Sequence, residues 1–173
     1  KKQCEIMLIK CFKKTNIDLK IFRPFTVYGT YARPDMIFLT YLKKSLENKS
    51  FYLFNKGNYM RDFTYVGDVA KILTKFLSVG KIKKKIFNIC SSKPIKIKKI
   101  IPIINKYSKQ KCKIVLKPYR KGEMIKTYGD NKQIRKIVNF KKFTNINAGI
   151  KKTINWYLGF KNKDILYFDK VKY

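Results

Sequence analysis

One stretch, residues 17–36, constrains the fold more than any other. Apolar and polar residues alternate over residues 17–22, the period of a strand with one buried face. A polar loop follows, and Pro34 and Asp35 then suit a helix start, because proline fixes φ and a carboxylate caps free backbone N–H groups. Strand, loop and helix in this order predict part of an open α/β sheet, whose ligands lie beyond the carboxyl ends of its strands. The loop is therefore a candidate ligand site, although an ordinary surface loop fits the pattern equally well.

The rest of the chain alternates helices with short strands. We expect helices over residues 2–14, 35–48, 68–77, 95–107 and 130–138 and from residue 144 onward, and strands over 51–54, 86–90 and 112–116. Pro102 should break or kink the fourth helix, because proline lacks an N–H and clashes with the preceding turn. Asp68 complements the dipole at the start of its helix, so we interpret it as structural. No apolar run approaches the roughly 20 residues that cross a bilayer, so we expect no membrane segment.

The charge of the chain is strongly positive. Its 173 residues include 42 Lys and Arg against 10 Asp and Glu, a net charge of +32, which raises nucleic acid or an anionic membrane as a partner. However, the lysines are spread along the chain, and Lys, Ile, Asn, Phe and Tyr are abundant together, the skew of an AT-rich genome. We favour this compositional explanation over a nucleic-acid footprint. We expect no specific nucleic acid and only non-specific attraction of polyanions at low salt.

The cysteines do not form a metal-binding or disulfide pattern. Cys4, Cys11, Cys90 and Cys112 contain no C-x-x-C pair, and the chain has no histidine to complete a metal set. Reduced thiols in a cytoplasmic protein are the simplest interpretation. The first residues lead into an amphipathic segment and do not resemble a secretion signal.

Four blocks of sequence carry a family resemblance. They are Arg-Pro-Phe-Thr-Val-Tyr-Gly with Arg-Pro-Asp-Met (23–36), Met-Arg-Asp-Phe-Thr-Tyr-Val-Gly-Asp-Val-Ala (60–70), Phe-Asn-Ile-Cys-Ser-Ser-Lys-Pro-Ile (87–95), and Thr-Asn-Ile-Asn-Ala-Gly-Ile with Asn-Trp-Tyr (144–157). In this order they resemble the C-terminal part of the NAD-dependent epimerase/dehydratase family, the extended short-chain dehydrogenase/reductases. The Arg-Pro-Asp-Met turn is most similar to the UDP-glucuronate 4-epimerase branch. The resemblance covers roughly residues 1–160.

The resemblance implies a fold and an assembly. The fold is α/β, comprising the C-terminal part of a doubly wound Rossmann-type parallel sheet and a smaller α/β substrate domain. Residues 1–34 and 62–90 would be the remnant of the dinucleotide-binding domain, and 35–61 and 91–160 the nucleotide-sugar domain. Residues 161–173 look like a tail. Family members often form homodimers, which we expect of the full-length parent.

Three residues are assigned to the NAD cofactor by the resemblance. Lys1 matches the lysine of a Tyr-x-x-x-Lys motif, which holds the nicotinamide ribose and lowers the pKa of the catalytic tyrosine. It is the one catalytic residue that we assign, and the tyrosine would lie four positions upstream, outside this sequence. An ordinary solvated lysine is the alternative. Pro24 and Phe25 would pass beside the nicotinamide.

Five residues are assigned to a UDP-sugar substrate by the resemblance. Thr26 and Arg33 would meet the sugar, with Arg33 facing the uronate carboxylate. Arg61 would bind the diphosphate as a bidentate fork, and a surface contact with the neighbouring Asp62 is its alternative. Phe54 falls where the family has an aromatic residue near the base. Arg120 could also reach the diphosphate or remain solvated, in a segment where Lys121 and Glu123 depart from the family's Pro-Gly-Asp pattern.

Essential parts of the family's machinery are not found in this sequence. It contains no Gly-rich loop to seat the NAD pyrophosphate and no catalytic tyrosine motif. We therefore expect an inactive C-terminal fragment of an epimerase that removes and returns hydride at sugar C4. A nucleotide-sugar dehydratase or a UDP-hexose 4-epimerase is the alternative within the family. Two further alternatives differ in class: a basic non-catalytic nucleic-acid binder, and a non-catalytic subunit that completes a partner chain bearing the Gly-rich loop.

Overall fold

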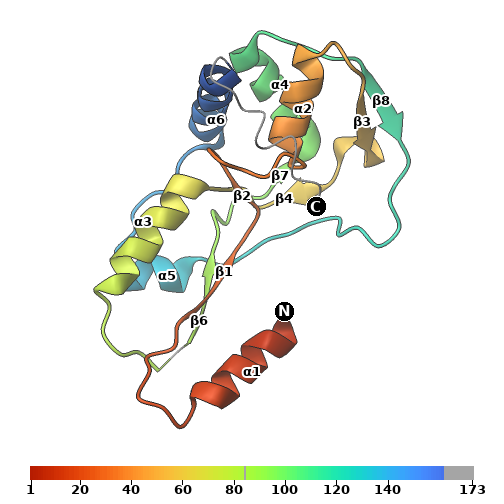
Figure 1. The fold of residues 1–173 in the computed structure, drawn as a ribbon. Coiled ribbons are helices and arrows are strands. Elements are labelled where there is room, and N and C mark those ends of the chain that lie inside the picture. Colours follow the sequence, from red (N-terminus) through yellow and green to blue (C-terminus); the bar gives the residue numbers. More distant parts are fainter. Residues whose placement is uncertain (84, 162–173) are drawn as a thin grey trace.

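A computed structural model describes residues 1–83 and 85–161 (Figure 1). The helices are α1 (Lys2–Phe12), α2 (Ile37–Leu46), α3 (Val66–Leu77), α4 (Ile97–Ser108), α5 (Lys132–Ile137) and α6 (Ile146–Lys161), with a 3-10 turn η1 at Asn55–Gly57. The strands are β1 (Ile21–Pro24), β2 (Val27–Tyr28), β3 (Phe51–Phe54), β4 (Met60–Arg61), β5 (Thr64–Tyr65), β6 (Ile86–Ile89), β7 (Ile95–Lys96) and β8 (Ile114–Lys117). The expected tail lies outside the described residues from 162 onward.

The strands pair mostly in parallel. β1 pairs with β6, β2 with β5 and β3 with β8, all in parallel, and β4 pairs with β7 in antiparallel orientation. Parallel pairs need crossover connections, and the chain between each parallel pair here contains at least one helix. The predicted α/β class is therefore confirmed.

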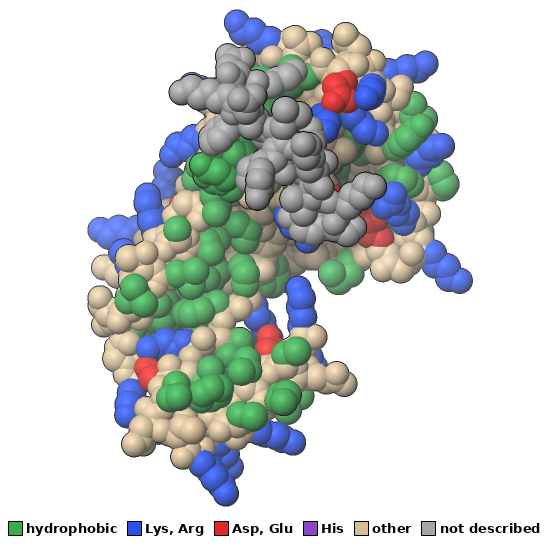
Figure 2. Space-filling model, in the orientation of Figure 1, with side chains coloured by type: hydrophobic (Ala, Val, Ile, Leu, Met, Phe, Trp, Pro, Cys, Tyr) green, Lys and Arg blue, Asp and Glu red, His purple; other side chains and the backbone are tan. Residues whose placement is uncertain are grey.

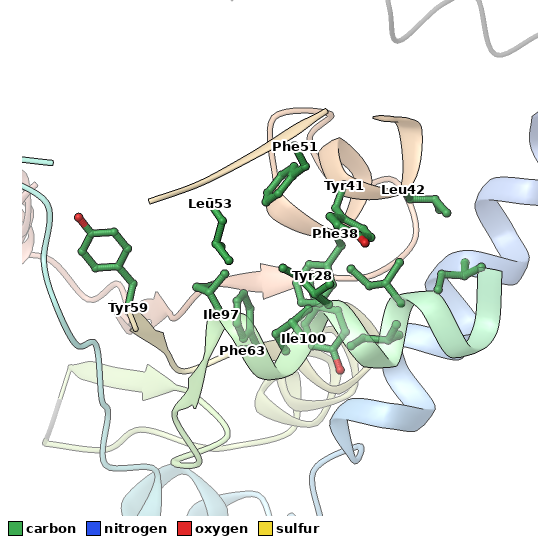
Figure 3. Packing of buried hydrophobic residues seen from close by; sticks show 14 residues of the cluster. Tyr28, Phe38, Tyr41, Leu42, Phe51, Leu53, Tyr59, Phe63, Ile97 and Ile100 are labelled. Carbon is green, nitrogen blue, oxygen red and sulfur yellow. The ribbon is translucent and has the colours of Figure 1, made fainter. Parts of the chain in front are cut away.

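Two hydrophobic clusters form the core. The first joins α2, α4, α6 and β3, and the rings of Tyr28 and Phe38 stack in it with centroids 4.8 Å apart (Figure 3). The second joins α3, α5 and β6, where Phe76 and Phe87 lie with ring centroids 5.0 Å apart. In Figure 1 the first set of elements lies in the upper part of the molecule and the second below it.

Helix α1 stands apart from both clusters. It has no buried residue, although Ile6, Met7 and Leu8 are apolar. Its Glu5 carboxylate accepts two hydrogen bonds from the guanidinium of Arg23 on β1. This ion pair lowers the pKa of Glu5, chiefly through the hydrogen bonds from Arg23.

The first strand begins later than the sequence pattern predicts. Residues 17–22 were expected to form it, but pairing with β6 starts at Ile21, opposite Ile86. Before that point the Lys20 ammonium binds the Asp18 carboxylate at 2.6 Å and the Val79 carbonyl at 2.9 Å. The alternation upstream of Ile21 therefore belongs to an irregular segment held by the side chain of Lys20 and not to a ladder.

Two expectations about helices were wrong. Helix α4 is continuous through Pro102, because Pro102 is exposed while the opposite face buries four isoleucines, whose packing outweighs one lost hydrogen bond. Asp35 does not cap α2. The N-cap residue is Met36, which makes no side-chain cap, and the Asp35 carboxylate binds Arg33 instead.

Candidate substrate-binding cavity

One cavity brings together the five residues that the resemblance assigns to a substrate. It has a volume of about 630 Å³, within the usual size of small-molecule sites. Thr26, Arg33, Phe54, Arg61 and Arg120 all line it. They come from the loop between β1 and β2, the segment between β2 and α2, the end of β3, β4 and the segment after β8, so five separate parts of the chain meet there. Their roles in binding stay predictions.

Arg61 is held in place by its neighbour Met60 and by two residues of the segment after β8. Its Nη1 donates to the carbonyls of Met60 at 2.9 Å and Met124 at 2.7 Å, and its Nη2 donates to Glu123 Oε1 at 3.0 Å. The guanidinium also lies over the ring of Tyr59, 5.5 Å from its centroid. The alternative of a surface contact with Asp62 is wrong, because the neighbouring carboxylate points elsewhere.

Asp62 is a buried structural centre that the sequence analysis missed. Its carboxylate accepts hydrogen bonds from the backbone N–H groups of Ser91 (3.0 Å), Ser92 (3.1 Å) and Gly129 (3.3 Å) and from Ser91 Oγ (2.6 Å). Asp62 is fully buried, so these donors replace its lost hydration. The signal in the sequence was a carboxylate between the short strands at Met60–Arg61 and Thr64–Tyr65, with two consecutive serines after the next long strand. Asp62 thereby fixes the strand ends beside Arg61.

Arg33 lies at the exposed mouth of the cavity. Its guanidinium donates two hydrogen bonds to the Asp35 carboxylate, one of them at 2.9 Å from Nε to Oδ1. The pairing lowers the pKa of Asp35, with the hydrogen bonds from Arg33 as the largest cause. The two side chains are 69% and 57% exposed, so this pair is weak and a ligand carboxylate could compete with Asp35 for Arg33.

Arg120 and Phe54 form a stacked pair in the same wall. The guanidinium carbon of Arg120 lies 3.8 Å from the centroid of the Phe54 ring, a cation–π contact. The backbone N–H of Arg120 donates to Tyr59 Oη at 2.9 Å, which anchors the loop after β8. Arg120 is thus exposed but held in position. Phe51 and Leu53, which share β3 with Phe54, are buried in the core.

The charges of the cavity suit an anion. Three arginines and two carboxylates, Asp35 and Glu123, line it, which leaves one net positive charge. Arginine forks bind phosphate oxygens in a bidentate manner, and the aromatic walls offer a surface for a planar base. Both carboxylates are engaged by arginines, so the described lining offers no free general base. The charges and rings of the lining fit the binding of an anion.

The three residues assigned to NAD lie elsewhere. Lys1 is exposed at the start of α1, and Pro24 is exposed at the carboxyl end of β1. The Phe25 N–H donates to the Ile89 carbonyl at 2.9 Å, and the ring of Phe25 lies against Gly129, where an added Cβ would come within 2.7 Å of Cζ. The structure does not place Lys1 in the cavity or show it beside the other two.

Comparison with known proteins identifies the family. The model of the "NAD dependent epimerase/dehydratase family" matches residues 1–90, about half of the chain. This chain belongs to the NAD-dependent epimerase/dehydratase family. A UDP-glucuronate 4-epimerase of Thermodesulfobacterium geofontis is 31% identical over 157 residues, which cover 90% of this chain and 48% of that protein. An uncharacterized protein of Methanocaldococcus jannaschii is 38% identical over 144 residues, 83% of this chain and 43% of that protein.

A solved family structure agrees in fold. The UDP-glucuronic acid 4-epimerase from Bacillus cereus, in complex with UDP-glucuronic acid and NAD, superimposes with a TM-score of 0.79 at 26% identity. The match covers 90% of this chain and 50% of that structure. The expected Rossmann-like α/β fold is therefore confirmed. This chain spans about half the length of the family members that it matches.

The family is NAD-dependent, and the described residues fit one end of that cofactor. Parallel sheets receive nucleotides beyond the carboxyl ends of their strands, and β1 ends there at Pro24 and Phe25. The close approach of Gly129 to Phe25 keeps this edge free of a further side chain. No Gly-rich loop that would seat the NAD pyrophosphate occurs in this sequence, and the placement of Pro24 and Phe25 beside the nicotinamide stays a prediction.

Proposed function

We propose that these residues form the UDP-sugar-binding part of an NAD-dependent 4-epimerase whose substrate is UDP-glucuronate. The observation that carries the proposal is the convergence of Thr26, Phe54 and three arginines from separate segments on one cavity. The similarity to UDP-glucuronate 4-epimerases supports the choice of substrate. In keeping with this, we propose that the full-length parent is a cytoplasmic homodimer. Within the described residues, no helix is long and apolar enough to cross a membrane.

Each residue of the cavity has a proposed part. Arg61 and Arg120 bind the diphosphate, because both line the cavity and both carry a permanent positive charge. Phe54 packs against the uracil base. Thr26 and Arg33 hold the sugar, and Arg33 leaves Asp35 to bind the uronate carboxylate.

The chemistry depends on groups beyond this cavity. NAD, when bound, accepts hydride from sugar C4 and returns it to the opposite face. Pro24 and Phe25 would hold the nicotinamide end at the carboxyl end of β1. Lys1 would bind the nicotinamide ribose and favour the tyrosinate of a neighbouring catalytic tyrosine by its charge.

Titration calorimetry tests the assignment on the 173-residue chain. We expect UDP-glucuronate to bind, and Arg61→Gln to weaken both UDP-glucuronate and UDP-glucose by about 10-fold or more, because a hydrogen bond to a charged group is lost. Arg33→Gln should weaken UDP-glucuronate far more than UDP-glucose. Arg23→Gln is the matched control, since Arg23 is also an exposed, ion-paired arginine but does not line the cavity.

Two outcomes would contradict the proposal. Equal losses of both sugars on Arg33→Gln would favour a UDP-hexose epimerase or a dehydratase of the same family. An unchanged affinity on Arg61→Gln would remove the cavity from consideration. We also expect no epimerisation when UDP-glucuronate and NAD are added to this chain, and robust turnover would refute the inactivity of the isolated chain.

The basic surface gives the nucleic-acid alternative little support. Figure 2 shows lysine and arginine side chains scattered around the outline of this face, without a single stripe. Non-specific attraction predicts binding that vanishes near physiological salt. Tight binding with a sequence preference at that salt would instead revive a nucleic-acid function.

A further inference from the structure

A second cavity lies next to the first and is separate from it. Its volume is about 390 Å³, and it is bounded by the segment after β6, β7, α4, α5 and the start of α6. Phe63 lines both cavities and stands between them. None of the residues assigned to UDP-sugar or NAD lines the second cavity.

The second cavity is lined by cations without a carboxylate. Its basic residues are Lys93, Lys99, Arg135, Lys141 and Lys142. The first cavity differs, because there Asp35 and Glu123 engage two of its arginines. Within the described residues, the ammonium groups of the four lysines have no ion pair or hydrogen bond. Their charges are therefore available to a ligand.

Arg135 shapes the loop that carries two of these lysines. Its Nε donates to the carbonyl of Phe140 at 3.1 Å, and its Nη2 donates to the carbonyl of Lys141 at 2.7 Å. The guanidinium thus holds residues 140–142 against α5, and both Lys141 and Lys142 line the cavity. Because the loop is already held by Arg135, a ligand that binds there pays only a small entropic cost for ordering it.

Two buried carboxylates, Asp62 and Asp68, contact residues of the cavity wall but do not line the cavity themselves. Asp62 is enclosed by its four hydrogen bonds, one pair of which comes from Ser91 in the cavity wall. Asp68 accepts from the N–H of Thr144 at 2.6 Å and from its Oγ1 at 2.8 Å. Thr144 also leads into α6, whose N-terminal end lines the cavity and adds a partial positive charge.

We propose that this second cavity binds a small polyvalent oxyanion of the pyrophosphate class. Lysine ammonium groups bind phosphate oxygens as point charges, and a concave site lined by one sign of charge concentrates the field. The cavity is a hollow of limited volume and not an extended groove, so a compact anion fits it better than a nucleic-acid strand.

Charge-matched variants separate this site from the general basic surface. Lys93→Ala/Lys142→Ala removes two charges from the cavity, and Lys132→Ala/Lys136→Ala removes two exposed charges on α5 that do not line it. A third variant, Arg61→Gln/Arg120→Gln, removes two charges from the first cavity. Each 173-residue variant is titrated with pyrophosphate by calorimetry at about 150 mM salt, where exposed charges are largely screened.

We expect the first variant to lose affinity for pyrophosphate by about tenfold or more, because two charge-assisted contacts are removed, and the second variant to keep it. Equal losses in the first and second variants would overturn the proposal in favour of diffuse attraction. A loss confined to the third would assign the anion to the first cavity. A single-stranded oligonucleotide that binds more tightly than pyrophosphate, with equal dependence on both lysine pairs, would assign the surface to nucleic acid and also overturn it.

A measurement on the unmodified chain keeps the proposal testable if a variant fails to fold. Lysine acetylation is mapped by mass spectrometry with and without pyrophosphate. The cavity lysines should be protected while Lys132 and Lys136 keep their reactivity. Equal protection of both groups would contradict a specific site.

Discussion

The hydrogen bonds of Asp62 lead to the sharpest prediction about stability. In Asp62→Asn the amide keeps the shape of the carboxylate, and its oxygen can still accept from Ser91. The new NH₂ group, however, faces the N–H groups of Ser92 and Gly129, which lie 3.1 and 3.3 Å from Oδ2 in the native chain. Two hydrogen bonds to a charged acceptor are lost, and buried donors are left without a partner.

The expected cost follows from these two bonds. A hydrogen bond to a charged group contributes about 1.5–3 kcal/mol, so the variant should lose about 3 kcal/mol or more. With a urea m-value of about 2 kcal/mol/M, the unfolding midpoint should fall by about 1.5 M at unchanged slope. Urea titration followed by far-UV circular dichroism measures this shift.

Asp35→Asn is the matched control. It also removes one negative charge from a chain of net charge +32, but from an exposed ion pair. Its cost should stay below about 1 kcal/mol. If the two variants lose the same stability, the reasoning about buried donors is refuted.

Two further predictions concern packing and a thiol. Gly149→Ala should destabilise the fold by about 1–3 kcal/mol, because an added Cβ would overlap the buried Tyr28 hydroxyl. Gly159→Ala should be neutral or stabilising, because within the described residues an added Cβ would meet no atom within 4 Å beyond its own helix backbone and chain neighbours. Thermal unfolding compares the two, and equal effects would contradict the packing argument. Burial raises the pKa of the Cys90 thiol to about 11, so at pH 8 only about one in a thousand of these groups is thiolate. Ellman's reagent should therefore label the two exposed cysteines of α1 first and Cys90 only in urea, and rapid labelling of Cys90 in the native chain would disprove its burial.

The sequence predicted the parts of the fold that depend on local pattern. Helices with an apolar stripe, such as α2 and α4, were placed within a few residues, because their periodicity reflects the face that they bury. Pro102 was misjudged because local propensity was weighed without the packing of the opposite face. The start of β1 was misjudged because a ladder begins where a partner strand is available, and β6 lies more than 60 residues away.

The candidate site was predictable where motifs are contiguous. Thr26, Arg33 and Arg61 stand in recognisable blocks, and the structure places them around one cavity. Asp62 was missed as a structural centre because its partners are 29 to 67 residues distant in sequence. The stacking of Arg120 on Phe54 joins the end of β3 to the segment after β8, more than 60 residues apart in sequence, so only the folded chain reveals it.

The two hydrophobic clusters share the chain in alternating segments. Phe22 packs in the second cluster, Tyr28 to Phe63 in the first, and Ile72 to Ile89 in the second again. The first cluster then resumes at Ile97 and both are completed only by residues 134–158, in α5, α6 and their connection. During synthesis neither cluster can be completed until residues 134–158 have emerged from the ribosome. Such long-range closure slows folding and leaves apolar surface of the nascent chain exposed until α6 docks.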